Sequence, residues 1–121
     1  MTEIRIKRIY DEPSADDGFR VLVDRLWPRG VARATAALDR WDKDVAPSSE
    51  LRTWFNHRPD RFTQFAERYC AELAGSGAVV ALLAAAGDRD RITVLYAARD
   101  PEVNHARVLR DYLAEVGGAP R

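Results

Sequence analysis

The sequence predicts a small α/β domain with a mostly parallel sheet of three or four strands flanked by helices. Short apolar runs rich in β-branched residues, typical of buried strands, alternate with amphipathic segments of helical period. Turn-forming residues separate these segments, and no repeat or linker interrupts them. A length of 121 residues is usual for one domain, so residues 1–121 are expected to fold as a single unit.

The composition argues against several classes of protein. Lys plus Arg and Asp plus Glu number 19 each, whereas a general nucleic-acid binder is normally basic. Cys70 is the single cysteine and the two histidines lie far apart, so neither a disulfide nor a metal site is expected. The sequence has no Walker-type glycine loop and no dinucleotide fingerprint, and no cofactor is predicted.

The N-terminus lacks an apolar signal region, and no apolar run reaches the roughly 18 residues that cross a bilayer. We therefore expect a cytoplasmic protein without membrane contact.

The first part of the chain predicts three strands and a short helix. Residues 3–9 alternate apolar and charged side chains, as a strand does, and a polar loop follows at 11–18. Phe19–Asp24 is the second and more buried strand. The Ala-rich residues 31–38 favour a short helix, and residues 39–45 a third strand or an extended segment.

Two helices are predicted in the middle of the chain. Ser48 is the candidate N-cap of the first, which stops before Pro59. The second begins near Pro59-Asp60 and has a strong amphipathic face, which residues 75–77, Gly-Ser-Gly, interrupt.

The remaining segments predict a buried helix, a strand and a final helix. Residues 78–86 are apolar all round, which indicates a buried helix, and residues 91–97 read as a central strand. Asp100 and Pro101 have the chemistry of an N-cap and a first-turn proline, so the last helix is expected to start there. It is expected to end at residues 117–118, Gly-Gly.

Two segments that follow strands carry the candidate site. Residues 24–30, Asp-Arg-Leu-Trp-Pro-Arg-Gly, follow the second strand, and residues 96–105 extend from the end of the central one. If both strands run parallel in one sheet, these segments share its carboxyl edge, where α/β proteins bind ligands. We expect Asp24 and His105 to be the catalytic candidates. The ligand-binding candidates are Arg25, Trp27, Arg29, Tyr96, Arg99 and Asn104.

The residue types suit recognition of an anion. Guanidinium groups bind carboxylate or phosphate in a bidentate manner, and histidine exchanges a proton near neutral pH.

Each residue also has a structural interpretation: Asp24 could close a strand end by pairing, and His105 could pack against the sheet. Arg52 could extend a positive pocket or lie on a solvated face. Cys70 is interpreted as a buried, inert thiol.

Three groups of motifs carry a family resemblance. They are Val-Asp-Arg-Leu-Trp-Pro-Arg-Gly at 23–30, Ala-Pro-Ser at 46–48 with Leu-Arg-Thr-Trp-Phe at 51–55, and Leu-Tyr-Ala-Ala-Arg-Asp at 95–100 with Asn-His-Ala at 104–106. In these motifs the chain resembles the YeaO-like proteins, domain of unknown function 488. The resemblance covers nearly all of the chain. It implies a small cytosolic α/β protein of bacteria or archaea, and no established activity.

The chain also resembles, at a distance, longer proteins of the same broad group. Those carry Cys-His-Arg after the corresponding late strand, where this chain has Asn104-His105-Ala106. A thiolate mechanism of the sulfur-transfer or cysteine-phosphatase kind therefore has no nucleophile here.

Three functions remain open on the sequence. The first is an enzyme acting on a small phosphorylated or carboxylated metabolite, held by arginines, with Asp24 and His105 moving protons. The second is a non-catalytic small-ligand or nucleotide-binding module in which Trp27 or Tyr96 stacks on a ring. The third is a protein-interaction adaptor that presents Trp27 and Pro28. The sequence leaves the oligomeric state open.

Overall fold

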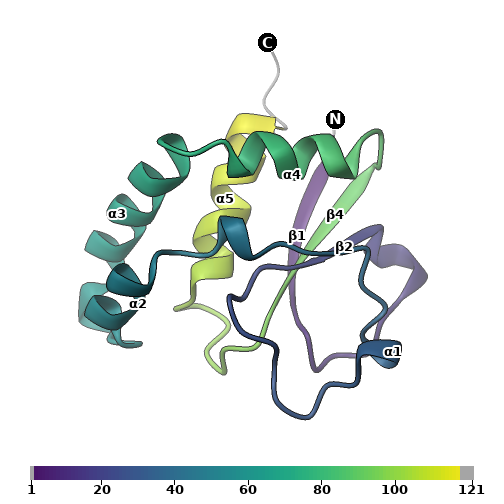
Figure 1. The fold of residues 1–121 in the computed structure, drawn as a ribbon, viewed down its shortest axis with the longest axis horizontal. Coiled ribbons are helices and arrows are strands. Elements are labelled where there is room, and N and C mark those ends of the chain that lie inside the picture. The colour runs from purple at the N-terminus through teal and green to yellow at the C-terminus, as the bar shows by residue number, and fades with distance from the viewer. Residues whose placement is uncertain (1, 118–121) are drawn as a thin grey trace.

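The computed structural model describes residues 2–117 and contains a four-stranded, all-parallel sheet in the order β1-β4-β2-β3 (Figure 1). This confirms the predicted α/β class. The strands are β1 Glu3–Arg8, β2 Phe19–Leu22, β3 Arg40–Trp41 and β4 Arg91–Tyr96. The helices are α1 Arg33–Ala36, α2 Ser49–Phe55, α3 Phe62–Ala74, α4 Ala78–Ala86 and α5 His105–Gly117. Short 3₁₀ turns lie at Ala15–Asp17, Lys43–Val45 and Pro59–Arg61.

Strand β4 lies at the centre of the sheet, as its apolar run predicts. It pairs with β1 on one side and with β2 on the other, so that Val94 lies between Ile6 and Val21. Alternate side chains of a strand point to opposite faces. Val94 accordingly belongs to the large hydrophobic core, whereas Leu95 belongs to a smaller cluster.

Helices cover one face of the sheet more completely than the other. The larger core lies between the sheet and helices α2 to α5, and α5 packs along β1 and β4. Figure 1 shows α2, α3 and α5 to one side of the strands and α1 to the other. The smaller cluster unites Leu22 and Leu95 with Trp27 and Trp41, which come from the segments around α1. The polypeptide that leaves β2 therefore covers the second face itself.

A buried polar network stabilises this second face. Arg20 forms an ion pair with Asp17 and donates to the carbonyls of Ala36 (2.8 Å) and Ala37 (2.9 Å). Burial favours the protonated form of Asp17, but hydrogen bonds from the Ser14 N–H group and from Lys7 and Arg20 outweigh it. The pKa of Asp17 is therefore lowered.

Some helix boundaries follow from side-chain caps. Ser48 caps α2 as predicted, because its Oγ accepts the Leu51 N–H group at 3.1 Å. The predicted start of the last helix at Asp100 and Pro101 is wrong. Asp100 Oδ1 instead accepts the N–H groups of Glu102 (2.8 Å) and Val103 (3.2 Å) and closes a turn.

Asn104 then caps α5, since its Oδ1 accepts the Arg107 N–H group at 2.8 Å. The helix extends to Gly117, and the expected end at Gly118 lies outside the described residues.

Three weakly patterned segments are shorter or more exposed than predicted. Within residues 31–38 the helix is one turn, ended by Ala37 in the left-handed region at φ 52°. Within residues 39–45 the strand has two residues, and a 3₁₀ turn follows. Helix α4 forms as predicted but leaves one face open, with Val80 71% exposed. Among the described residues no single helix is long and apolar enough to span a membrane. Only the pair formed by residues 59–74 and α4 reaches the required length and hydrophobicity, and the two helices are bent by 76° at the break between them.

Candidate functional site

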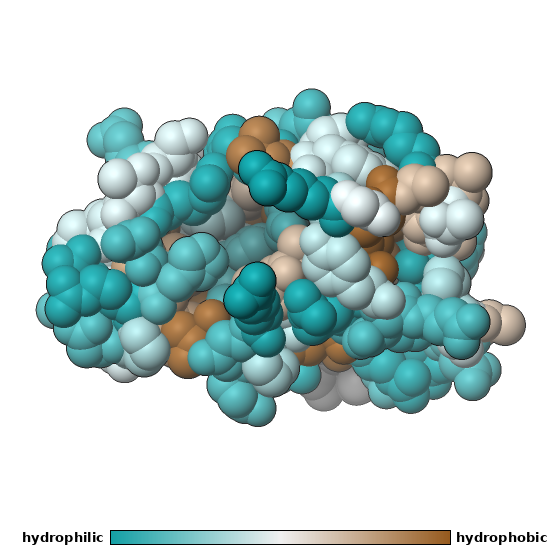
Figure 2. All heavy atoms as spheres, turned by 90° about the horizontal axis from the view of Figure 1, so that it is seen from below, coloured by the Kyte–Doolittle hydropathy of each residue, from teal (hydrophilic) through white to brown (hydrophobic). Residues whose placement is uncertain are grey.

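A cleft of about 960 Å³ opens at the carboxyl edge of the sheet. Because β2 and β4 are adjacent and parallel, the segments that follow them meet at this edge. The cleft is lined by residues 24–26, 46–47, 52–53, 55–57, 65, 97–100 and 103–105. Figure 2 looks onto this end of the molecule and shows mainly hydrophilic atoms around a hollow, with smaller hydrophobic patches between them. The cleft size is typical of small-molecule sites.

Asp24 connects the three main segments of the cleft. It lies two residues after the end of β2, and its Oδ2 accepts the N–H group of Ala97, the residue after β4, at 3.0 Å. Its Oδ1 lies 3.1 Å from Nε2 of His105, the first residue of α5. Its backbone carbonyl accepts the indole N–H group of Trp41 at 2.7 Å. The predicted proximity of Asp24 and His105 is therefore present.

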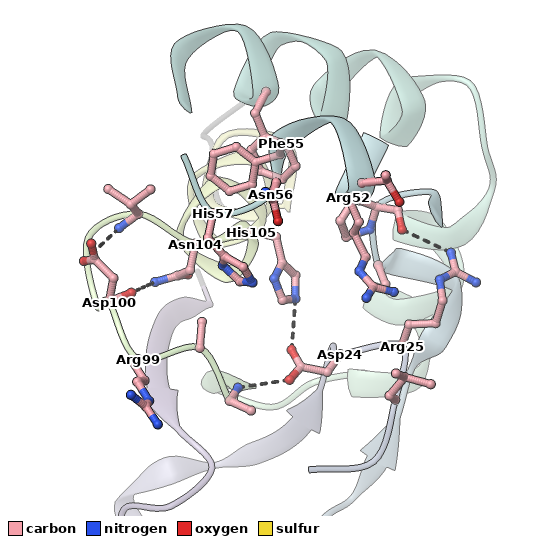
Figure 3. Close-up of a pocket in the computed structure, with 18 residues that line it drawn as sticks. Asp24, Arg25, Arg52, Phe55, Asn56, His57, Arg99, Asp100, Asn104 and His105 are labelled. Atoms are coloured by element: carbon pink, nitrogen blue, oxygen red, sulfur yellow. Dashed lines mark hydrogen bonds and ion pairs between the residues drawn. The ribbon is translucent and has the colours of Figure 1, made fainter. Parts of the chain in front are cut away.

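The surroundings of His105 determine which ring nitrogen carries a proton. Nε2 faces two acceptors, Oδ1 of Asp24 at 3.1 Å and the carbonyl of Val23 at 3.2 Å. Because Nε2 hydrogen-bonds to the Val23 carbonyl, which can only accept, this nitrogen carries the hydrogen. Oδ1 of Asp24 lies within ion-pair distance of it but is buried and has no hydrogen-bond partner among the described residues. No described residue forms a hydrogen bond with Nδ1, so this atom is the one left for a ligand. Figure 3 shows the imidazole pointing from the start of α5 toward Asp24.

Three arginines line the cleft without forming an ion pair with any described carboxylate. Arg25 follows Asp24 and donates to the Pro47 carbonyl at 3.1 Å. Arg52 projects from α2, and Arg99 lies in the loop between β4 and α5; both are exposed. Asp24 and Asp100 are the acidic residues of the lining, so the cleft carries one net positive charge with both histidines neutral.

The wall opposite Asp24 comes from α2 and the turn after it. Phe55 and Phe65 stack with ring centroids 4.2 Å apart and give the cleft an aromatic wall. Asn56 and His57 both adopt positive φ, 47° and 55°. Asn56 is the left-handed C-cap of α2, a common arrangement, but His57 continues the strained conformation beyond it. His57 also lines the cleft.

The structure separates the candidate residues into two groups. Asp24, Arg25, Arg99, Asn104 and His105 line the cleft. Asn104 is also committed to structure, because its Nδ2 donates to the Asp100 carbonyl while its Oδ1 caps α5.

The other three candidates lie outside the cleft lining. Trp27 donates its indole N–H group to the Val31 carbonyl at 2.8 Å and packs against Trp41. Arg29 is exposed, and Tyr96 is buried in the main core, 2% exposed. Tyr96 points inward because it alternates with Leu95 along β4.

Two residues that support the site were not among the candidates. Arg8, at the end of β1, donates to the carbonyls of Ala97 (3.2 Å) and Ala98 (3.0 Å) and fixes the loop that holds Asp24. Trp41 fixes the backbone of Asp24 itself. For Arg8, the only feature in the sequence that could have indicated this role is its place in the alternating first strand. For Trp41, no feature of the sequence indicates the hydrogen bond to Asp24.

Neither Cys70 nor a metal centre contributes to the cleft. Cys70 is half-buried on α3, away from the cleft lining, and burial raises the pKa of its thiol. The raised pKa agrees with an inert thiol, but the side chain is only half-buried, not buried as predicted. No group of histidine, cysteine and acidic side chains suited to a metal ion occurs among residues 2–117.

Comparison with known proteins assigns the chain to a family. The family model described as "Inactive DUF488-N3 subclade" matches residues 3–117. The chain is 44% identical over 110 residues to the uncharacterized protein YeaO of Escherichia coli (strain K12), covering 91% of this chain and 96% of that protein. It is 45% identical over 112 residues to the uncharacterized protein Rv3073c of Mycobacterium tuberculosis (strain ATCC 25618 / H37Rv), covering 93% and 94%. No solved structure gives a significant match. The chain therefore belongs to the YeaO-like DUF488 family, in the subclade described as inactive.

Proposed function

We propose that this protein binds a small anionic molecule in the cleft at the carboxyl edge of its sheet and does not transform it. The observation that carries the proposal is the presence of Arg25, Arg52 and Arg99 around one cleft, none of them in an ion pair with a described carboxylate. Guanidinium groups are the preferred partners of carboxylates and phosphates. A phosphorylated or carboxylated metabolite is the class of ligand that fits.

The carboxylate of Asp24 is compatible with a bound anion. Its oxygens face the Ala97 N–H group and Nε2 of His105, so its negative charge is directed into the protein. A protonated His105 would neutralise it and present an Nδ1–H donor to the ligand. The pair thereby adds a hydrogen-bonding group between the arginines.

Arg25 adds a second argument for an oxygen-rich ligand. Its Nε–H group is buried and has no hydrogen-bond partner among the described residues. An unsatisfied buried donor costs about 1–3 kcal/mol, more when it is charged. A ligand oxygen that drew this guanidinium into the cleft would remove that cost.

The family description supports binding over catalysis. The matching subclade is described as inactive, and no serine, cysteine or lysine occurs in the described lining of the cleft. The lining therefore lacks the side chains that most often serve as activated nucleophiles.

The proposal is tested by thermal unfolding with inorganic pyrophosphate at constant ionic strength. At ten times its Kd a ligand adds about 1.4 kcal/mol, which raises the Tm of a chain of this size by roughly 5 °C. Arg52→Gln should lose most of the shift, whereas Arg29→Gln should keep it, because Arg29 is an exposed arginine of the same signature outside the cleft lining. An equal loss in both variants, or no shift in the wild type, would contradict the proposed cleft.

The geometry of His105 favours one second candidate, general acid–base catalysis. A carboxylate at 3.1 Å orients the imidazole and leaves Nδ1 unbonded, which is the arrangement of an oriented base. Turnover of a phosphorylated or carboxylated metabolite that His105→Gln abolishes and Arg29→Gln preserves would establish it. Binding without turnover supports the primary proposal.

A further inference from the structure

We propose that the ligand has two anionic groups joined by a neutral, partly apolar segment; this rests on the proposed function of the same cleft. In Figure 3, Arg25 and Arg52 lie on one side of His105, and Arg99 lies on the other. The positive charge of the cleft is thus divided between two ends. A ligand with an anionic group at each end can contact both ends of the cleft at once.

The first end is formed around Pro47. Arg25 is tied to the Pro47 carbonyl at 3.1 Å, and Arg52 lies one turn into the helix that Ser48 begins. The two guanidinium groups come from segments that meet at this point, after β2 and in α2. Together they provide more donors than one carboxylate can accept, so a carboxylate or a phosphate can be held here.

The second end is formed by the loop between β4 and α5. Arg99 is exposed and forms no hydrogen bond or ion pair with a described residue. The neighbouring Asp100 forms no ion pair with it; Oδ1 of Asp100 accepts the N–H groups of Glu102 and Val103. The loop itself is held in place by Arg8 through the carbonyls of Ala97 and Ala98. Arg99 is therefore a free cation on a fixed backbone.

The space between the ends suits an uncharged segment. Asp24 and His105 stand in the middle, with the carboxylate turned toward Ala97 and the imidazole. The lining also contains apolar side chains, among them Leu26, Phe55 and Phe65. Leu26 is 69% exposed, and a ligand in the cleft would cover part of it. An aliphatic or aromatic spacer matches this surface.

Linear dicarboxylates test the inference, because their spacer length can be varied. We would measure the Kd of succinate, glutarate, adipate, pimelate and suberate by calorimetry at constant ionic strength. Monocarboxylates with the same number of carbons serve as ligand controls. Once one carboxylate is bound, the second binds intramolecularly, so a spacer of matching length should bind at least about tenfold more tightly than its monocarboxylate.

Substitution of Arg99 assigns this gain to the second end. Arg99→Gln should reduce the affinity of the best dicarboxylate to that of its monocarboxylate, Arg99→Lys should restore part of the gain, and Arg29→Gln should change neither. Since Arg99 is exposed and unpaired, the unliganded Tm of these variants should equal that of the wild type.

The outcomes separate the two proposals. Equal affinities of dicarboxylates and monocarboxylates at every length would overturn the two-ended ligand and leave an anion site with one end. The absence of binding by any of these acids and by pyrophosphate would overturn both proposals.

Discussion

Asp24 shows how one side chain can organise a site. Its Oδ2 accepts the Ala97 N–H group after β4, and its backbone carbonyl accepts the indole N–H group of Trp41. Its Oδ1 lies 3.1 Å from Nε2 of His105 at the start of α5. Asp24 and His105 could be found in the sequence because each follows a strand or begins a helix at the expected edge. Trp41 could not be found, because the direction of its indole depends on how the second face packs.

The arginines show that residue type and position in a motif do not predict which side chains line the cleft. Arg25, Arg29 and Arg99 look alike in the sequence, yet Arg29 lies outside the cleft lining. The carbonyl of Arg29 accepts the Tyr10 hydroxyl at 3.1 Å, which ties that part of the chain to the segment after β1. Between Arg25 and Arg29 the chain turns to cover the second face, and no local pattern announces this change of direction.

Asp17 gives a prediction about acid stability. Because its pKa is lower in the folded chain, the unfolded chain binds the proton more readily, and acid favours unfolding. Its contribution is complete above the ordinary pKa of 3.8 and is lost as the pH falls through the folded-state value. Asp17→Asn should lower the free energy of unfolding by roughly 3 kcal/mol at pH 7, since Arg20 loses its buried partner.

The measurement for Asp17 is urea unfolding between pH 2 and pH 7. The difference between wild type and Asp17→Asn should shrink as the pH falls below about 4. Asp16→Asn, an exposed neighbour, is the control and should follow the wild type. A difference that is independent of pH would contradict the assigned role.

At the scale of elements, long and strongly patterned segments could be predicted and short ones could not. The alternation in residues 3–9 and the apolar run at 91–97 correspond to β1 and β4, and the amphipathic face corresponds to α3. The start of α5 differs by about four residues, because Asp100 and Asn104 both have capping chemistry. The choice between them is made in the folded protein, where Asn104 is 2% exposed and has two backbone partners.

The cap of α5 provides a prediction at this scale. Asn104→Ala should lower the free energy of unfolding by about 0.5–2 kcal/mol, because the first turn of α5 loses an acceptor. Asn104→Asp keeps the acceptor oxygen of the cap but loses the Nδ2 donor to the Asp100 carbonyl, so it should restore only part of the loss. Pro101→Ala should have little effect, since Pro101 precedes the helix. A larger loss for Pro101→Ala than for Asn104→Ala in chemical denaturation would place the start of the helix at the earlier position.

At the scale of the whole molecule, the order of the strands creates the site. Strand β4 returns between β1 and β2, so the segments after β2 and β4 are neighbours although more than 70 residues separate Asp24 from Ala97. The sequence predicted the shared edge on the condition that the strands are parallel, and that condition is met. The sequence left open whether Arg52 of α2 extends the pocket or lies on a solvated face, and no pattern predicts that Phe55 of the same helix also lines this edge.

The most direct test of an anion-binding cleft is a titration with pyrophosphate, followed by the chemical shifts of backbone amides in ¹H–¹⁵N NMR spectra. The account predicts saturable shifts at the three walls, represented by Arg25, Arg52 and Arg99, and none near Cys70 on α3. Shifts centred away from the carboxyl edge of the sheet, or no saturable shift at any amide, would contradict it.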